Sequence, residues 1–429
     1  MTEVFATFFI LMLMGMPVCF AIGIAGTVFF FSQPTLPSSI PVQLTLTQTQ
    51  SFVLLAIPLF MFAGNLLNES GITHRLMKLS AVLAGHMRAG LAQVNTVLAA
   101  MMGGITGSAI ADATMQARVL GPGMIERGYS RGFAAGVIGF SSLIVTMIPP
   151  GIGLILYGSI GEVSIGRLFA GGLVPGFLMT VLMMLAISWT ARRKGYEPER
   201  QQPVSFKEGF ATFMECIWAF LFPILLIAGL RFGFFTPSEA GAFAVAYAII
   251  IGLAVYRELT WKKFLKTLEE TVTDIGMVML LICMSAIFSY GLTWEQIPQQ
   301  LAEFMLGISS TPWVIMLIII VFLLVAGMFM DSTVLILLLT AILIPVVKEV
   351  GIDLVHFGVI MILTLTFGLL TPPVGVVTYI VCTIFECSIS SLFKEAWPLF
   401  LACVAVALAC VFFPELVLFV PDLIFGKQL

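Results

Sequence analysis

Hydrophobic residues run along this chain in long blocks that are interrupted at only a few places. About 20 consecutive apolar residues are enough to span a bilayer, so blocks of this length predict membrane helices. The blocks long enough to cross once are 4–31, 52–68, 132–158, 165–191, 212–234, 238–256, 270–292, 354–385 and 396–420. The pattern therefore predicts an all-α polytopic membrane protein.

Two more apolar blocks, 90–120 and 312–347, carry small polar residues in their middles. These interruptions read "MMGGITGSAIAD" and "AGMFMDST". Each block predicts two half-length helices joined by a polar turn, which is a re-entrant hairpin that enters and leaves on one side. Irregular backbone at membrane depth is tolerated only where it is buried in protein or lines a wet cavity.

Two of the predicted spans contain a tandem proline near their middles. Pro149 and Pro150 interrupt 132–158, and Pro372 interrupts 354–385. Proline removes an N–H donor and clashes with the preceding turn, so both spans are expected to be discontinuous helices. A broken helix leaves carbonyl and N–H groups without intrahelical partners. The carbonyl end suits a cation, and the N–H end suits an anionic group.

The interruptions recur at one spacing. Pro149 and Pro372 are 223 positions apart, and so are Gly104 and Gly327. Each half reads as a span, an interfacial helix (71–90 or 292–307), a hairpin, a broken span and a span. The expected parts are a first repeat at 1–191, a charged cytoplasmic linker at 192–210, and a second repeat with an extra scaffold helix at 211–429. An inverted repeat of this kind is typical of secondary transporters.

The charged residues agree with a membrane location. They make up 10% of the chain, whereas soluble domains carry about 25%, so lipid is the expected solvent. With the N-terminus in the cytoplasm and the hairpins not crossing, 16 of the 20 Lys and Arg residues are cytoplasmic, as the positive-inside rule requires. The four placed outside are Arg167, Arg231, Lys348 and Lys427. The C-terminus is then periplasmic, and the net charge of −3 indicates no nucleic-acid partner.

Four stretches resemble the large membrane subunit of the tripartite ATP-independent periplasmic (TRAP) transporters. They are "GGITGSAIADATMQARVLGPGMIERGYSRGFAAG", "GLRFGFFTPSEAGAFAVAYA", "GMFMDSTVLILLLTAILIP" and "LTFGLLTPPVGVVTY". The resemblance covers essentially the whole chain. One departure is Thr106, where the family more often has serine, and either residue supplies a hydroxyl.

The resemblance implies a function and partners. Family members reside in the bacterial inner membrane and import organic acids, such as sialic acid or C4-dicarboxylates, with a sodium gradient. A periplasmic binding protein delivers the substrate. The fold is similar to the ion-transporter superfamily, with an elevator motion in which hairpins and broken helices move against a scaffold. The chain begins at its first span, so the four-helix small membrane subunit is expected to be a separate polypeptide.

Two or more sodium ions are expected, at the hairpin tips against the helix breaks. Hard cations prefer oxygen ligands, which hydroxyls and carbonyls supply. The first site would draw on Gly104, Thr106, Gly107, Ser108, Pro150, Gly151 and Gly153. The second would draw on Gly327, Asp331, Ser332 and Thr333, facing Thr371, Pro372, Gly375 and Thr378.

Several residues allow two interpretations. Asp112 is an intramembrane acid, functional by default, or else it caps its hairpin helix. Ser108 and Thr378 either bind an ion or bond the carbonyl four residues back. Glu239, in "FTPSEA", fits a helix start better than a transport role. Glu69 and Glu386 lie at predicted span ends and are expected to be solvated, whereas Arg118, Arg127 and Arg131 are expected to be cytoplasmic anchors.

No arginine lies mid-span, so half-helix N-termini and hydroxyls are the expected partners of a substrate carboxylate. The main alternative function is a self-sufficient sodium/dicarboxylate or sodium/proton carrier. An intramembrane enzyme is not expected, because the chain lacks GxSxG, HExxH and convergent paired aspartates. A channel would need a continuous polar pore face, which these blocks do not have.

Overall fold

The computed structural model describes residues 1–200, 204–309 and 311–427, and within them the chain forms helices and no named strand. Residues 201–203 of the predicted linker lie outside this part. The first half contains α1 (Thr2–Leu13), α2 (Val18–Ser32), α3 (Ile40–Thr49), η1 (Val53–Leu55), α4 (Ala56–Glu69), α5 (Ile72–Ala84), α6 (Gly90–Met102), α7 (Ala109–Val119), α8 (Gly121–Glu126), α9 (Arg131–Met147), α10 (Ile152–Gly161) and α11 (Ile165–Lys194). The second half contains α12 (Phe206–Glu215), α13 (Ile217–Arg231), α14 (Pro237–Ile250), the π-helical turn η2 (Ile251–Val255), α15 (Trp261–Trp294), α16 (Ile297–Ile308), α17 (Pro312–Gly327), α18 (Ser332–Glu349), α19 (Leu354–Gly368), α20 (Val376–Phe385), α21 (Ile389–Phe412) and α22 (Glu415–Phe425).

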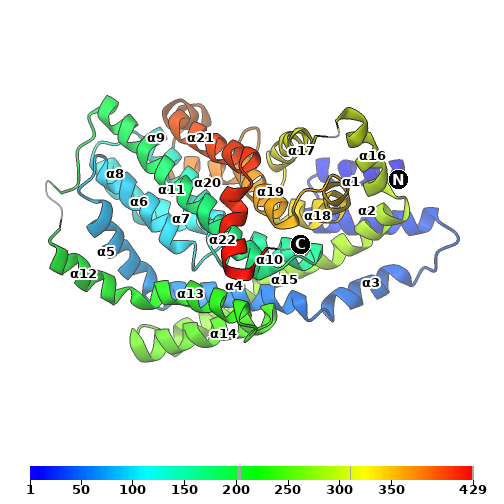
Figure 1. Cartoon of the computed structure of the whole chain (residues 1–429), viewed down its shortest axis with the longest axis horizontal. Coiled ribbons are helices and arrows are strands. Elements are labelled where there is room, and N and C mark those ends of the chain that lie inside the picture. Colours follow the sequence, from blue (N-terminus) through cyan, green and yellow to red (C-terminus); the bar gives the residue numbers. More distant parts are fainter. Residues whose placement is uncertain (201–203, 310, 428–429) are drawn as a thin grey trace.

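The helices pack in two groups. Helices α1 to α4 and α13 to α15 pack mainly on one another, and we call them the outer group. Helices α6 to α11 and α17 to α22 form the second, or inner, group, while α5 and α16 touch both. In Figure 1, α4, α13 and α14 lie along the lower edge of the view, with α9, α11 and α21 above them.

The apolar content of the helices matches the predicted membrane protein. Among the described residues, five helices are long and apolar enough to cross a membrane, or up to eight if each of three bent pairs is one span. Helices α6 and α7 occupy the block 90–120, and α17 and α18 occupy 312–347. Helices α9 and α10 occupy 132–158 with a bend of 41° between them, and α19 and α20 occupy 354–385.

The prediction of one span at 4–31 is wrong. Helix α1 ends at Leu13, and α2 starts only after Gly15, which has a φ of +82°, and Pro17. The two helices then pack side by side near the N-terminus (Figure 1). Phe288 of α15 contacts the ring of Phe8 in α1 and lies against Gly26 in α2, as expected if the chain folds back on itself. The sequence pattern missed this turn because apolar residues continue through it.

The region around the predicted linker also differs from expectation. Helix α11 continues through the basic residues to Lys194, and α12 starts at Phe206, inside the predicted linker. Helix α12 exposes Phe206 and Phe210 and is bent by 56° from α13. The predicted span 212–234 therefore falls on two helices, of which α13 is apolar except for Arg231 at its end.

Helix starts follow the predicted chemistry where a capping residue is present. The hydroxyl of Thr236 accepts from the Glu239 N–H, and the Glu239 carboxylate accepts from the Thr236 N–H. This reciprocal capping box satisfies two N–H groups that the helix leaves free. It supports the structural interpretation of Glu239.

Most of the charges that the sequence singles out at the ends of the predicted spans are paired. Arg127 lies 3.1 Å from Glu199, and Arg131 lies 2.7 Å from Glu386. Glu69 lies 3.8 Å from Lys263, with both side chains partly exposed. The side chains of Glu69 and Glu386 are thus accessible to solvent, as predicted. Each also lies next to a cationic side chain. Pairs this exposed contribute about 0–1 kcal/mol each, so they orient loops more than they stabilise the fold.

Candidate functional site

The first hairpin tip lies directly on the first helix break. A Cβ atom on Gly107 would be 2.6 Å from the Pro150 carbonyl oxygen, and one on Gly103 would be 2.5 Å from Ile148. Gly107 has a φ of +59°, so glycine suits both its backbone and its contact. The peptide bond between Pro149 and Pro150 is cis. The tip and the break therefore approach backbone to backbone, as the sequence predicts.

The second tip meets the second break in the same way. The Gly375 N–H donates to the Met328 carbonyl at 3.4 Å. A Cβ atom on Gly327 would be 3.1 Å from the Gly368 Cα. The Pro372–Pro373 peptide bond is also cis. Both breaks thus share a tandem cis proline and a glycine contact with a tip.

The hydroxyls of Thr378 and Ser108 make hydrogen bonds that distinguish the two interpretations of these residues. The Thr378 hydroxyl donates to the Leu370 carbonyl at 2.7 Å, eight residues back, and so satisfies a carbonyl at the break. The Ser108 hydroxyl accepts from the Ala111 N–H at 3.4 Å and caps α7. Neither bonds the carbonyl four residues back. Thr106 and Thr371 do so, at 3.4 Å and 3.0 Å.

Both tips and parts of both broken helices line one cavity of about 100 Å³. The predicted site residues among its lining are Gly107, Ser108, Gly153, Asp331, Ser332 and Thr333. The remaining lining residues are Ala109, Ile110, Thr146, Ile152, Ile336, Ile362, Thr366 and Leu369. The predicted residues that do not line it are Gly104, Thr106, Pro150, Gly151, Gly327, Thr371, Pro372, Gly375 and Thr378. All lining residues belong to the inner group of helices or to the turns that join them.

The cavity offers charge of both signs. Among the described residues that line it, Asp331 is the only charged one. The Asp331 carboxylate caps α18 by accepting from the Thr333 N–H at 2.8 Å. Helices α7, α10 and α18 all begin at the cavity, so their partly positive N-termini converge there. The site can therefore hold a cation at the carboxylate and an anionic group at the helix N-termini.

Sequence reasoning missed Thr146 and Thr366. Each lies one turn or less before a break, and each hydroxyl donates to a carbonyl of its own helix, at 2.8 Å for Thr146 and 2.7 Å for Thr366. Both residues line the cavity, and a hydroxyl oxygen that donates one hydrogen bond can still accept another. Their position just before a proline-interrupted segment was the available signal.

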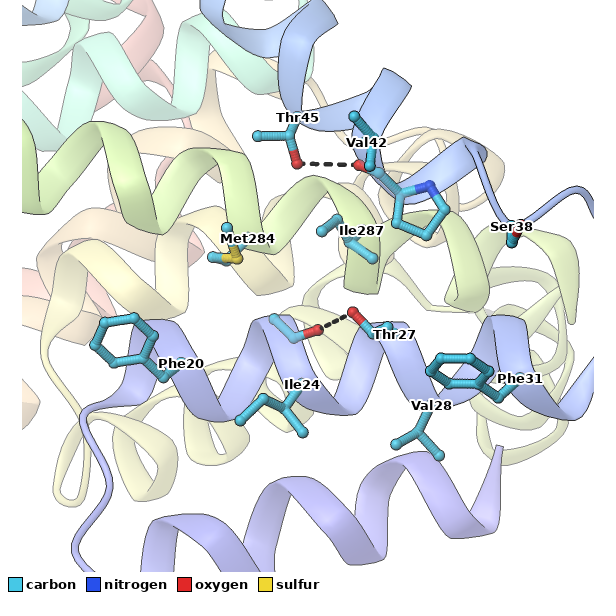
Figure 2. Close-up of a pocket in the computed structure, with 12 residues that line it drawn as sticks. Phe20, Ile24, Thr27, Val28, Phe31, Ser38, Val42, Thr45, Met284 and Ile287 are labelled. Atoms are coloured by element: carbon cyan, nitrogen blue, oxygen red, sulfur yellow. Dashed lines mark hydrogen bonds between the residues drawn. The ribbon is translucent and has the colours of Figure 1, made fainter.

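A larger groove of about 520 Å³ is a poorer candidate for an organic acid. It lies between α2, α3 and α15, and its walls are mainly apolar side chains such as Phe20, Ile24 and Ile287 (Figure 2). The Thr27 and Thr45 hydroxyls in it donate to the carbonyls of Gly23 and Pro41. The groove therefore lacks the charged and helix-terminal groups that the smaller cavity has.

Comparison with known proteins gives a consistent result. The family model described as "Tripartite ATP-independent periplasmic transporter, DctM component" matches residues 5–416. The chain is 35% identical over 416 residues to the sialic acid TRAP transporter large permease protein SiaM of Vibrio cholerae, covering 97% of each chain. It is 33% identical to the isethionate TRAP transporter permease protein DctMQ of Oleidesulfovibrio alaskensis, covering 97% of this chain and 65% of that longer one.

A solved structure shares the fold. The YdaH transporter of Alcanivorax borkumensis superposes with a TM-score of 0.60 at 14% identity, covering 87% of this chain and 88% of that one. At this identity the likeness concerns the arrangement of helices alone.

Proposed function

The chain belongs to the DctM component family of the tripartite ATP-independent periplasmic transporters, and from that premise we propose that it imports an organic acid together with sodium ions. It is a multi-pass large permease subunit of such a transporter. The observation that carries the proposal is the shared cavity, where Asp331 and three helix N-termini meet. One carboxylate suits a monovalent cation, and the N-termini suit the acid group of the substrate.

The substrate class follows from the relatives and the cavity together. SiaM and DctMQ are named for sialic acid and isethionate. Both are organic acids, with a carboxylate and a sulfonate respectively. Backbone N–H groups and the Ser108 and Ser332 hydroxyls at the cavity can donate to either kind of anion. A C4-dicarboxylate fits the same chemistry.

The sodium ions are proposed to lie where each tip meets its break. Ser108, Gly107 and Gly153 face the cavity at the first tip, and Asp331, Ser332 and Thr333 face it at the second. The residues behind them, including Thr106, Pro150, Thr371 and Gly375, hold the backbone at the break. Binding the ions at these junctions would fix the tips and thereby complete the substrate site.

An elevator motion is proposed, with the inner group moving past the outer group. The cavity lies wholly within the inner group, so substrate and ions would travel with it. The halves 1–191 and 211–429 would be the inverted repeats that give the inner group its two similar ends. A bacterial inner membrane is the proposed location, with the basic loops in the cytoplasm.

The fold-back of α1 on α2 changes the orientation that we propose for the N-terminus. Because α1 and α2 fold back on each other, the chain would leave this pair of helices on the same side of the membrane as it entered. With the basic loops still in the cytoplasm, the N-terminus would then be periplasmic rather than cytoplasmic, on the same side as the C-terminus. A small membrane subunit and a periplasmic binding protein complete the proposed transporter.

Reconstitution in liposomes tests this function. Uptake of the organic acid should require an inward sodium gradient, the small subunit and the binding protein together. Omission of any one should reduce uptake to the level of empty liposomes. Uptake by this chain alone would contradict the three-part transporter and favour a self-sufficient carrier.

Gly64 offers a test of the proposed motion. A Cβ atom on Gly64 of α4 would lie 2.6 Å from the Ile105 carbonyl oxygen of the first tip. Gly64→Ala should therefore lift the tip from the outer group and reduce uptake at least about fivefold, although alanine is favoured over glycine in a helix by about 1 kcal/mol. Gly276→Ala in α15, where a Cβ would meet nothing within 4 Å, is the control and should transport normally. Equal uptake by both variants would argue against a functional contact there.

A further inference from the structure

Arg75 on α5 joins several segments of the chain. Its Nη1 donates to the Gly71 carbonyl at 2.8 Å and to the Glu258 Oε1 at 2.6 Å. Its guanidinium also lies over the ring of Tyr256, 3.9 Å from the ring centre. The Tyr256 hydroxyl in turn donates to the Glu215 carbonyl at 2.9 Å. Arg75 therefore ties α5 to the α4–α5 turn, to the segment between η2 and α15 and, through Tyr256, to the end of α12.

The group formed by Arg75, Tyr256 and Glu258, which we call the Arg75 anchor, depends on arginine. A guanidinium can donate in two directions while it stacks on an aromatic ring, and an ammonium cannot do so. The backbone beside Glu258 is also unusual. Arg257 has a φ of +57°, which costs about 1–2 kcal/mol, and it closely follows the π-helical turn η2. Strained backbone persists only where the surrounding contacts hold it, and it gathers at functional sites. The anchor therefore calls for a role in transport as well as in the fold.

The start of α5 is attached to the outer group by the chain itself. Only Ser70 and Gly71 separate it from α4, a helix of the outer group. Arg75 lies one turn into α5, so it cannot move far from α4. Glu258 also belongs to the outer group, because its segment joins η2, which continues α14, to α15. The anchor thus connects segments that stay together when the inner group moves.

The far end of α5 adjoins the inner group. The 13 residues of α5 give it a length of about 20 Å, at about 1.5 Å per residue. At that end the Gly85 carbonyl accepts from the N–H groups of Glu199 and Arg200 at 3.0 Å and 3.1 Å. Glu199 also pairs with Arg127, which follows α8, and α6 begins at Gly90. Helix α5 is therefore a connector whose two ends are held by different groups.

A cavity of about 280 Å³ lies between the start of α5 and the two arms of the first hairpin. Its outer wall comes from α4, α5, the turn between them and the segment from η2 into α15, with the residues Asn68, Glu69, Gly71, Thr73, His74, Met77, Glu258 and Lys263. Its hairpin wall is formed by Leu98 of α6 and by Met115 and Val119 of α7. Glu258 of the Arg75 anchor thus lies in the outer wall. The cavity leaves the hairpin arms room to shift past that wall.

We infer that the Arg75 anchor is the fixed pivot of the connector helix α5, about which the first hairpin moves during transport. The inference rests on the proposed elevator motion. Arg75 is then a positioning residue, because neither it nor Tyr256 or Glu258 lines the 100 Å³ cavity where substrate and ions are proposed to bind. A pivot that is held firmly makes the far end of α5 follow one path. If the pivot is loosened, the start of α5 tilts instead, and the hairpin moves more slowly.

The first test is a double-mutant cycle in the reconstituted transporter with its small subunit and binding protein. Arg75→Ala should lower the maximal uptake rate at least about fivefold and leave the half-saturating concentrations of sodium and organic acid nearly unchanged. Glu258→Ala should act alike, and the double variant should be no slower than either single one, because both remove the same contact. Arg75→Lys should recover part of the rate. The control is Lys266→Ala, which breaks a 3.5 Å pair with Glu270 inside α15 and should transport normally.

The second test asks which wall of the 280 Å³ cavity moves. His74 and Lys263 lie in the outer wall, and Val119 lies in the hairpin wall. A bismaleimide that joins His74→Cys to Lys263→Cys should leave uptake unchanged. The same reagent joining His74→Cys to Val119→Cys should reduce uptake at least about tenfold. Both pairs are made with Cys19→Ser and Cys387→Ser, because the other five cysteines are buried, and mass spectrometry gives the cross-linked fraction.

The outcomes separate the pivot from the proposed function. Loss of uptake on joining positions 74 and 263 would overturn the pivot, because the start of α5 would then have to move relative to α15. Additive losses in the cycle, or a raised half-saturating concentration at an unchanged maximal rate, would also overturn it. If Arg75→Ala does not fold, a normal maximal rate in Arg75→Lys overturns it. Full uptake with positions 74 and 119 joined would refute the elevator motion and the pivot together, while sodium-dependent uptake itself would stand.

Discussion

Replacing Asp331 with asparagine is expected to weaken sodium-dependent uptake strongly while the protein still inserts and folds. Asparagine keeps the size of the side chain and its ability to cap α18, but it removes the only charge lining the cavity among the described residues. An interaction with a charged group is worth about 1.5–3 kcal/mol, so apparent sodium affinity should fall by about 10- to 100-fold. Uptake measured against sodium concentration, with the amount of inserted protein determined in parallel, gives the result.

Asp353 provides the matched control for this prediction. It caps α19 as Asp331 caps α18, and its Oδ1 accepts from the N–H groups of Val355 and His356 at 2.8 Å and 3.0 Å. It does not line the cavity. Asp353→Asn should therefore retain sodium-dependent uptake. If both variants lose uptake to the same degree, the effect of Asp331→Asn comes from capping, and the proposed ion site at the second tip is not supported.

The positions of the helix breaks could be predicted because they have local causes. Tandem prolines remove backbone donors at fixed positions, and Gly107 and Gly375 allow positive φ where the chain turns. These residues specify an interruption whatever packs around them. The meeting of each tip with its break followed from the repeat spacing, because the two halves carry the same features in the same order.

Other features depend on contacts that no local pattern specifies. The fold-back of α1 on α2 depends on packing against Phe288, more than 250 residues further along the chain. The apolar pattern continues through the turn, so it resembles a single span. Thr146 and Thr366 were missed because a threonine in an apolar helix ordinarily bonds a carbonyl of its own helix, as both do here.

Gly107→Ala should reduce uptake at least about tenfold, because it disturbs the first tip where it rests on the first break. The substitution places a Cβ 2.6 Å from the Pro150 carbonyl oxygen, closer than real Cβ contacts allow. It also puts alanine at a φ of +59°, which costs about 1–2 kcal/mol for an L-residue. The tip must move away from the break, so the oxygens proposed to bind the first sodium separate. Initial uptake rates and half-saturating sodium concentration are the measurements.

The control variant Gly128→Ala separates the effect of backbone strain from the effect of displacing the first tip. Gly128, between α8 and α9, has a φ of +79°, but a Cβ there would meet nothing within 4 Å. The variant bears the same kind of backbone cost without any clash at the break. It should lose a similar amount of thermal stability yet keep near-normal uptake. Since backbone strain is common to both variants, a difference in sodium dependence can come only from the position of the tip, and equal sodium dependence would mean that the tip does not form the ion site.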